Sequence, residues 1–214
     1  MTPQEAALAE VARQFRDLMF TDPKEATMPA ITTQNYGQFA WRTAKILPPT
    51  AMLVHGALGL LTEVSELAEA NVVLKTADYV AKELGDIVWF CNYIHTSRFG
   101  GFINLDVAVP DRAGSSFSQD TFGLLTKVGE VGTVIKAYAF YDKPLNDDDL
   151  RGLLQDVIEF VRIMSYAFSL KFTDILQLNI DKLALRYPDK YTDAAAIARA
   201  DEAADAGADY VNQD

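Results

Sequence analysis

The sequence predicts an all-α protein, a helical bundle of two related helix pairs arranged in tandem. Apolar residues recur at the three- and four-residue spacing of a helix face in successive segments, and the prolines lie at the ends of those segments or between them. An eight-residue motif also recurs later in the chain. With 214 residues and half of them hydrophobic, the chain is long enough for one sizeable core. We expect one all-α domain over 1–214, with a first half at 31–100, a degenerate second half at 118–192 and an acidic, alanine-rich tail at 193–214.

Two helices are expected before the first repeated motif. Residues 3–20 have apolar residues at helical spacing and Thr2 as a candidate N-cap, and a proline-containing connection follows them. A helix over 34–46 carries several aromatic side chains, which favour burial of one face in the core. Trp41 and Phe39 of this helix are nevertheless kept as weaker candidates for a ligand pocket.

The stretch 55–90 contains two acidic pairs, each with a spacing of three residues, inside two strongly helical patterns. A spacing of three places both acids of a pair on one side of a helix, next to small residues on the first helix. Sixteen residues separate the pairs, enough to end one helix and bring the next back antiparallel. We therefore expect four carboxylates to converge: Glu63 and Glu66 from the first helix, Glu83 and Asp86 from the second.

Four converging carboxylates require a cation, because like charges raise one another's pKa and oppose folding. Mg²⁺ fits a site of oxygen ligands and takes further ligands from phosphates, which suggests chemistry on a phosphate ester or anhydride. Mn²⁺ is the alternative cation. The competing interpretation is two solvated helix faces, since a single acidic pair at this spacing is common on exposed helices.

The later part of the chain repeats the earlier part with losses. GLLTEVSE at 59–66 returns as GLLTKVGE at 123–130, and LGDIVWF at 84–90 is echoed by LQDVIEF at 154–160. In this alignment Lys127 replaces Glu63 and Leu153 replaces Glu83, which leaves Glu130 and Asp156 of the four acids. A lysine in place of a metal ligand predicts a structural second half that holds no metal in the same way.

The remaining elements follow from capping residues and prolines. Asn146 or one of the next three aspartates is expected to cap a helix that runs from 150 to about 171. Thr173 is the expected cap of a last core helix over 174–186, which Pro188 ends.

Composition narrows the classes of function. A net charge of −11 and a pI near 4.6 argue against a broad nucleic-acid surface, although a metal site still permits free nucleotides. Cys91 is the single cysteine, which excludes a disulfide framework and a zinc site of thiolates. The N-terminus has no secretory pattern, and we expect no membrane-spanning segment and a soluble, cytoplasmic protein.

The two acidic pairs also carry a family resemblance. Glu63-x-x-Glu66 and Glu83-x-x-Asp86, within GLLTEVSELAEA and KELGDIVWF, resemble the signature of the all-α nucleoside triphosphate pyrophosphohydrolases, the MazG-like group related to dimeric dUTPases and dCTP pyrophosphatases. The later NIDKLALRYP at 179–188 resembles the Asn-x-x-Lys-Leu-x-x-Arg-Tyr-Pro ending of many MazG-like domains. The resemblance implies Mg²⁺-dependent cleavage of a nucleoside triphosphate to monophosphate and pyrophosphate. A single-chain pseudo-dimer is expected, with a homodimer as the alternative.

The resemblance also implies roles for individual residues. The four acids would ligate Mg²⁺, and either a carboxylate or the bound cation would activate the attacking water. The candidates for contacts with the nucleotide are Lys82, Lys182, Arg186 and Asn179 for phosphate or ribose, His55 for a phosphate or a carboxylate, and Phe90 and Trp41 for the base. Each has a plain structural alternative, as a surface cation, a core ring or a basic helix end that offsets the helix dipole.

Two rival functions remain from the sequence. The chain could be a nucleotide-binding regulator or scaffold that kept the fold and lost turnover. A carboxylate-bridged di-iron protein is disfavoured, because neither His55 nor His95 follows a glutamate by three residues.

Overall fold

The computed structural model describes residues 29–73, 76–109 and 115–201 of the chain. All regular structure within these residues is helical, which confirms the all-α class. The helices are α2 (Tyr36–Trp41), α3 (Pro49–Val73), α4 (Ala77–Phe99), α5 (Phe117–Tyr141), α6 (Asp147–Ala167), α7 (Phe172–Arg186) and α8 (Asp193–Ala198). The helix expected over 3–20 and most of the tail lie outside the described residues.

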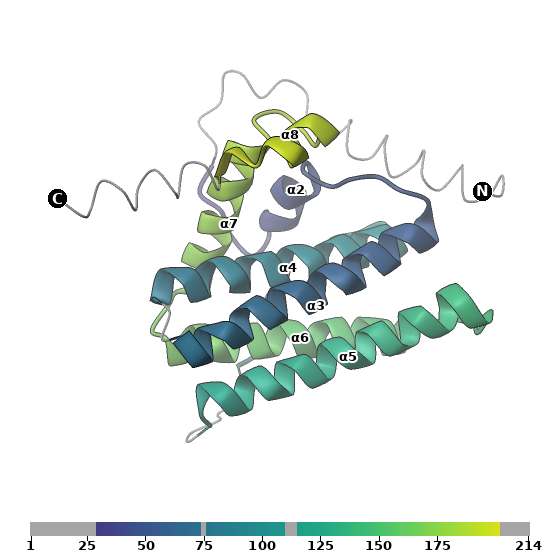
Figure 1. Cartoon of the computed structure of the whole chain (residues 1–214), viewed down its shortest axis with the longest axis horizontal. Coiled ribbons are helices and arrows are strands. Elements are labelled where there is room, and N and C mark those ends of the chain that lie inside the picture. The colour runs from purple at the N-terminus through teal and green to yellow at the C-terminus, as the bar shows by residue number, and fades with distance from the viewer. Residues whose placement is uncertain (1–28, 74–75, 110–114, 202–214) are drawn as a thin grey trace.

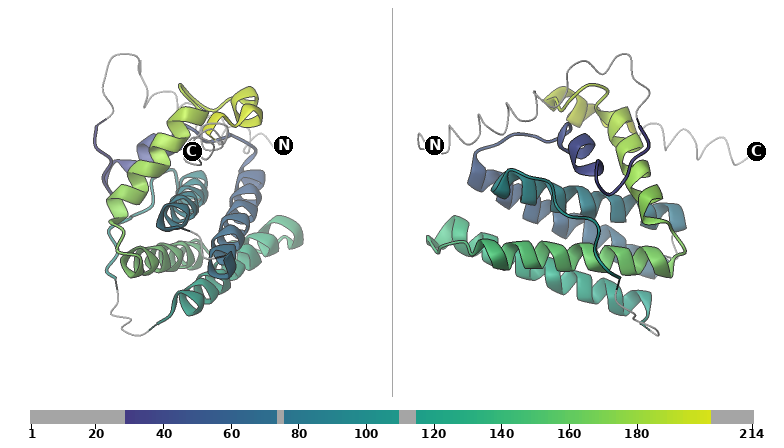
Figure 2. Two further views of the ribbon diagram at one scale, coloured as in Figure 1. Left: turned by 60° about the vertical axis from the view of Figure 1, so that its left-hand side comes forward. Right: turned by 180° about the vertical axis from the view of Figure 1, so that it is seen from behind.

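The four longest helices form a bundle of two antiparallel pairs (Figure 1). Helix α3 packs on α4 and α5 on α6, and the two pairs join through α3 against α5 and α4 against α6. Figure 2 shows the bundle from one end, with the pairs as two layers and α2, α7 and α8 outside the first layer. One continuous apolar cluster fills the interior, from Leu60 and Leu84 in the first pair to Leu124 and Leu154 in the second.

The ends of the bundle helices follow from local capping. Thr76 accepts a hydrogen bond from the Tyr79 backbone at the start of α4, and Gly100 ends that helix with a left-handed φ of 71°. Ser116 and Gln119 form a reciprocal capping box at the start of α5. Asn146 accepts from two backbone N–H groups of α6, so it is the cap among the candidates that the sequence offered.

The same glycine–phenylalanine contact occurs in both helix pairs. A Cβ atom on Gly59 would lie 2.1 Å from Phe90 Cε1, and one on Gly123 would lie 2.6 Å from Phe160 Cε1. These four residues occupy equivalent positions in the two sequence repeats. In each pair, therefore, a glycine lets a phenylalanine of the second helix lie directly against the first.

Helices α2 and α7 lie outside the bundle against α4, and they bring the C-terminal part of the chain beside the acidic pairs. The Arg42 guanidinium donates to the Tyr187 carbonyl oxygen at 2.8 Å, and the Tyr191 backbone donates to the Arg42 carbonyl at 3.3 Å. Lys45 pairs with Asp193 at 2.7 Å. These contacts hold the chain after α7 close to the loop between α2 and α3.

Several expected boundaries were wrong. Helix α2 ends at Trp41 and not near 46, because the chain enters a turn there. The backbone N–H groups of Thr43 and Ala44 donate to the carbonyl groups three residues earlier, at Ala40 and Trp41. Helix α6 ends at Ala167, four residues before the expected end, and Ser169 beyond it has a φ of 56°. Helix α7 begins at Phe172 with no side-chain cap, so Thr173 lies within the helix.

One described helix has the length and hydropathy of a candidate membrane span, so the expectation of no membrane-spanning segment stays a prediction. The segment Pro49–Glu69 of α3 has a mean hydropathy of 1.2, and core helices of soluble proteins pass the same test. In this fold α3 packs between α4 and α5, with Leu60, Val64 and Leu67 fully buried.

Candidate metal centre and nucleotide pocket

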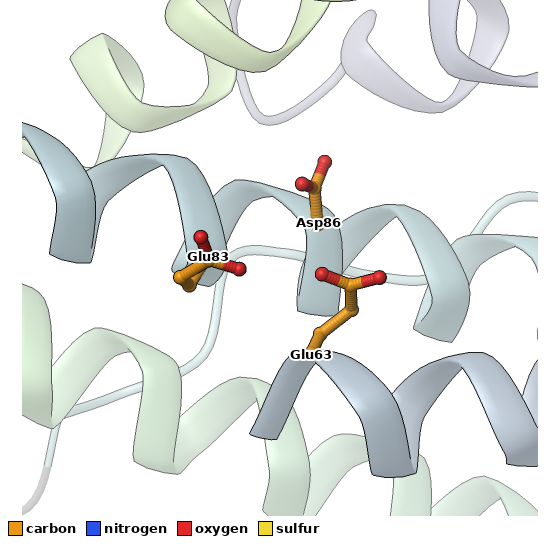
Figure 3. A group of neighbouring side chains, drawn as sticks. All are labelled: Glu63, Glu83 and Asp86. Carbon is orange, nitrogen blue, oxygen red and sulfur yellow. The ribbon is translucent and has the colours of Figure 1, made fainter. Parts of the chain in front are cut away.

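Three of the four predicted acids come together between α3 and α4. Glu63, Glu83 and Asp86 each place one carboxylate oxygen within 4.8 Å of the others. Figure 3 shows Glu63 extending from α3 toward the two acids of α4. Three carboxylate oxygens at such separations match the ligands that hard divalent cations prefer.

Close packing of α3 on α4 brings these acids together. Gly59 lies one turn before Glu63, and its missing side chain makes room for Phe90, one turn after Asp86. On the same two helices Gly56 admits Ile94 in the same manner, with its Cβ position 2.4 Å from Ile94 Cγ1. The helices therefore approach closely at this level, and side chains one turn further along meet across the gap.

Glu66, the fourth predicted acid, lies apart from the three. It is exposed, and it lines the same cavity without entering the group of close oxygens. The Tyr79 hydroxyl contacts its backbone carbonyl at 3.4 Å. Glu66 thus faces the solvent side of the acid group, while the other three meet between the helices.

Burial and mutual repulsion favour the protonated forms of two of these acids when no cation is bound. The pKa of Glu63 is raised to about 8, chiefly by desolvation and then by Asp86, Glu66 and Glu83. The pKa of Glu83 is raised to about 7, again by desolvation first and then by Asp86 and Glu66, while Lys182 opposes both shifts. The charge of a divalent cation would oppose both shifts, because it favours the ionised carboxylates.

The group also contains an unsatisfied buried acceptor. Glu83 is only 7% exposed, and its Oε2 is buried with no hydrogen-bond partner among the described residues. A buried carboxylate oxygen without a partner costs free energy. A cation held by Glu63, Glu83 and Asp86 would satisfy it, and three carboxylate oxygens are suitable ligands for a hard divalent cation.

Asp86 is held by two residues of α7. Asn179 Nδ2 donates to Asp86 Oδ1 at 2.7 Å, and Lys182 Nζ pairs with Asp86 Oδ2. Both side chains of the ion pair are 17% exposed, so it is shielded from solvent. The NIDKLALRYP segment therefore meets the acidic motif directly, although it lies almost a hundred residues further along the chain.

A cavity of about 500 Å³ opens beside the acids. Its lining combines three kinds of side chain. Besides the four acids it includes the cationic side chains Lys45, Lys82, Lys182, Arg186 and Arg199, and the rings of His55, Tyr79, Trp89, Phe90, Tyr187 and Tyr191. Carboxylates, cations and aromatic rings thus share one pocket.

Five of the seven residues predicted to contact substrate line this cavity: His55, Lys82, Phe90, Lys182 and Arg186. The rings of His55 and Phe90 meet edge to face at 5.9 Å. Partial burial, followed by the charge of Lys45, lowers the pKa of His55, so its ring is neutral at pH 7.

Three candidate contact residues do not line the cavity: Trp41 and Asn179 from the set of seven, and Phe39, the weaker candidate. Trp41 is 2% exposed and packs with Met52 and Tyr93 in a separate apolar cluster, so its role is in the core. Phe39 packs against the main core and also stays outside the cavity. Asn179 is 1% exposed and reaches the cavity only through Asp86.

Trp89 is one of the aromatic residues of the cavity wall that the sequence did not identify. Its ring stacks on Tyr93 at 5.2 Å with 16° between planes, and its Nε1 donates to Thr43 Oγ1 at 3.0 Å. It precedes Phe90 on a continuous apolar run, VWF, that reads as core. No local pattern distinguishes the cavity-facing ring from the buried ones in such a run.

Arg186 forms a two-point ion pair across the cavity wall. Its Nε and its NH2 nitrogen donate to the two oxygens of Asp201 at 2.7 and 2.6 Å, and Asp201 is 4% exposed. The hydrogen bond with Asp201 raises the pKa of Arg186 still further above its ordinary range. Arg186 therefore has a specific partner in Asp201, and any interaction with the dipole of its own helix is secondary.

The second helix pair holds its acids around a lysine. Lys127 Nζ lies 3.1 Å from Glu130 Oε2 and 3.1 Å from Asp156 Oδ2, and all three side chains are partly exposed. Lys127 occupies the position equivalent to Glu63, as the repeat predicts. An ammonium group therefore stands between the two acids that the second half retains.

Comparisons of the chain with protein-family models, curated proteins and solved structures found no match.

Proposed function

We propose that the protein is a Mg²⁺-dependent nucleoside triphosphate pyrophosphohydrolase, which converts a ribo- or deoxynucleoside triphosphate and water to the monophosphate and pyrophosphate. One observation carries the proposal. Glu63, Glu83 and Asp86 converge around a buried, unpartnered carboxylate oxygen at the wall of a pocket that also presents cations and aromatic rings. The resemblance of both motifs to MazG-like enzymes agrees with this reading.

The three clustered acids would hold Mg²⁺, with Mn²⁺ as a substitute. When bound, the cation supplies positive charge that neutralises and polarises the phosphate oxygens. The carboxylates fix its place between α3 and α4, and Asn179 and Lys182 hold the Asp86 carboxylate from the opposite side.

The cations of the pocket would bind the triphosphate. Lys82 and Lys182 lie on two different helices, α4 and α7, and both line the cavity with the acids. A chain of phosphates along this wall would lie between the acid group and these side chains. Lys182 is well suited to contact the phosphate nearest the cation, because it is already held at Asp86.

Glu66 is the best candidate for accepting the proton of the attacking water. It lines the pocket next to the three clustered acids, yet its carboxylate is exposed and outside the group that would hold the cation. A carboxylate in that position remains available as a base.

The aromatic wall would hold the base. Trp89 is fixed by stacking on Tyr93 and by its hydrogen bond to Thr43, and Phe90 and His55 lie beside it. Flat, immobilised rings stack on any nucleobase, so this wall explains binding without selecting one base.

The rival function is a nucleotide-binding regulator without turnover. One observation favours it, because the Lys182 ammonium already neutralises Asp86 and so reduces the need for a cation. The raised pKa values of Glu63 and Glu83 and the unpartnered Oε2 still favour a bound cation, which the enzyme requires.

A panel of ribo- and deoxynucleoside triphosphates with Mg²⁺, in which pyrophosphate and orthophosphate are measured separately, tests the proposal. We expect pyrophosphate and monophosphate from at least one substrate. Nucleotide binding without product would support the regulator, and orthophosphate as the only phosphate product would contradict the proposed bond cleavage.

A further inference from the structure

The Asp86 carboxylate is connected to a tyrosine outside the bundle by two hydrogen bonds in series. The Tyr36 hydroxyl, on α2, donates to Asn179 Oδ1 at 2.8 Å, and Asn179 Nδ2 donates to Asp86 Oδ1 at 2.7 Å. The connection thus passes from α2 through α7 to α4. Neither Tyr36 nor Asn179 lines the cavity.

The chemistry of the three groups fixes the direction of both bonds. An ionised carboxylate only accepts, so the Asn179 amide must turn its NH₂ group toward Asp86 and its oxygen toward Tyr36. Tyr36 must then donate. Burial, followed by the charge of Asp86, raises the pKa of the Tyr36 phenol, so it keeps the proton that it donates.

Close packing also restricts movement of the Asn179 side chain. Tyr36 is 0% exposed and Asn179 is 1% exposed. Gly85 lies directly against Asn179, since a Cβ at Gly85 would be 2.9 Å from the Asn179 Cβ. Because Gly85 has no side chain, Asn179 packs directly against the backbone of α4, and its amide reaches the Asp86 carboxylate.

We propose that Tyr36 and Asn179 are positioning residues of the cation site: the Tyr36 hydroxyl sets the orientation of the Asn179 amide, and the amide holds the Asp86 carboxylate in the orientation that the cation needs. The inference rests on the proposed function, because it concerns the metal centre of that function. It reassigns Asn179 from substrate contact to support of a ligand, and it gives α2 a part in the chemistry.

The orientation of a ligating carboxylate depends on its hydrogen-bond partners, and loss of such a partner typically lowers metal affinity by about 10- to 100-fold. Without the Tyr36 hydroxyl, no donor among the described residues on the α2 side favours the amide oxygen over the NH₂ group of Asn179. The amide can then turn its oxygen toward Asp86, which repels the carboxylate and displaces it.

The test uses Mn²⁺ alone as the probe, with binding followed by electron paramagnetic resonance on the full chain and no nucleotide. Tyr36→Phe keeps the ring and removes only the hydroxyl, and Asn179→Leu removes the amide at similar volume. We expect each variant to raise the Kd for Mn²⁺ by about tenfold or more.

The double variant separates a relay from two independent effects. If Tyr36 acts through Asn179, Tyr36→Phe will cause no further loss of Mn²⁺ affinity once Asn179 is leucine. Additive losses would overturn the inference, because they would mean that the tyrosine acts by another route.

Thr121→Val is the matched control for loss of a buried hydroxyl. Thr121 is 4% exposed in α5, and its hydroxyl donates to the Phe117 carbonyl at 2.8 Å. We expect it to lower the melting temperature without changing Mn²⁺ affinity. Melting temperatures of all variants are measured alongside, and an unchanged Kd in Tyr36→Phe would leave that residue a purely structural role and overturn the inference.

The outcomes also separate this inference from the proposed function. A wild-type chain that binds no Mn²⁺ would contradict the metal centre and the inference together. A wild-type chain that binds Mn²⁺ but cleaves no nucleoside triphosphate would contradict the proposed reaction alone, and the comparison of Tyr36→Phe with wild type would still decide the inference.

Discussion

At the scale of single residues, the proposed cation site depends on the charge state of two glutamates. Glu63 and Glu83 have pKa values raised to about 8 and about 7, mainly because α3 and α4 remove them from water. In an unfolded chain both would titrate near pH 4.3. The folded, cation-free protein therefore binds protons that the unfolded chain releases.

This difference predicts how stability changes with pH. Because the folded-state pKa values are raised, the stabilising contribution is complete below about pH 4 and is lost as pH rises through 7 and 8. We expect the free energy of unfolding without divalent cation to fall by on the order of a few kcal/mol between pH 5 and pH 8. Saturating Mg²⁺ should remove most of that fall, because it binds the ionised acids.

Urea unfolding at the two pH values, with and without Mg²⁺, measures the effect. The double variant Glu63→Gln/Glu83→Gln serves as control, and its stability should lose both the pH dependence and the response to Mg²⁺. Equal stabilisation by Mg²⁺ at pH 5 and pH 8 would contradict the charge states described here.

Glu66 gives a second prediction at this scale. Since its carboxylate lies outside the three clustered acids, Glu66→Gln should keep Mn²⁺ affinity within about twofold of wild type. Because Glu66 is the proposed proton acceptor, the loss of its carboxylate should lower kcat by about 10²- to 10⁴-fold. A large loss of Mn²⁺ affinity in Glu66→Gln would instead make it a fourth ligand.

The sequence predicted the convergence of four acids, and three of them meet, because the relation within each pair is local. A spacing of three residues places two carboxylates on one helix side whatever the rest of the fold does. Trp89, Asp201 and Tyr36 were not predicted, because their part in the pocket depends on which distant segments meet. The same reason explains why the prediction for Trp41 was wrong. Trp41 is the last residue of α2, and its side chain packs in a separate core cluster.

At the scale of elements, the segment after α7 closes one side of the pocket. Tyr191, Ala196, Arg199 and Asp201 all line the cavity, and the Arg186–Asp201 ion pair fastens this segment to α7. The sequence predicted an acidic, alanine-rich tail from residue 193, and nothing in that composition indicated a wall of the site. Helix α8 itself is short and has no buried residue.

Two variants test this wall. Asp201→Ala removes the anchor and leaves Arg186 in place, so we expect KM for the nucleotide to rise by about tenfold, equivalent to about 1.4 kcal/mol, with a smaller change in kcat. Arg186→Ala should show the same rise and an additional loss if the guanidinium also contacts phosphate. Normal kinetics in both variants would contradict a role in nucleotide binding and leave the Arg186–Asp201 ion pair only a stabilising contact.

At the scale of the whole molecule, two similar helix pairs carry different groups of charged side chains. The contacts of Gly59 with Phe90 and of Gly123 with Phe160 are alike, so both pairs use the same close packing. Their acids differ, because Lys127 lies between Glu130 and Asp156 where the first pair would hold a cation. The repeat in the sequence predicted this arrangement, since equivalent positions in a helix pair face one another in the same way.

The second pair would then complete the bundle without chemistry of its own. Helices α5 and α6 cover the faces of α3 and α4 that point away from the cavity, and the acids remain accessible on the other side. One chain would thus contain one working centre.

The most direct measurement compares pyrophosphate release by Asp86→Asn and Asp156→Asn with that of wild type, on the best substrate and with saturating Mg²⁺. The two aspartates occupy equivalent positions in the two pairs, and each change replaces one carboxylate oxygen by an amide. We expect Asp86→Asn to lose at least about a hundredfold in kcat/KM, or about 2.7 kcal/mol, and Asp156→Asn to retain nearly all of it. Equal activity in the two variants would contradict a single catalytic cation centre in the first helix pair.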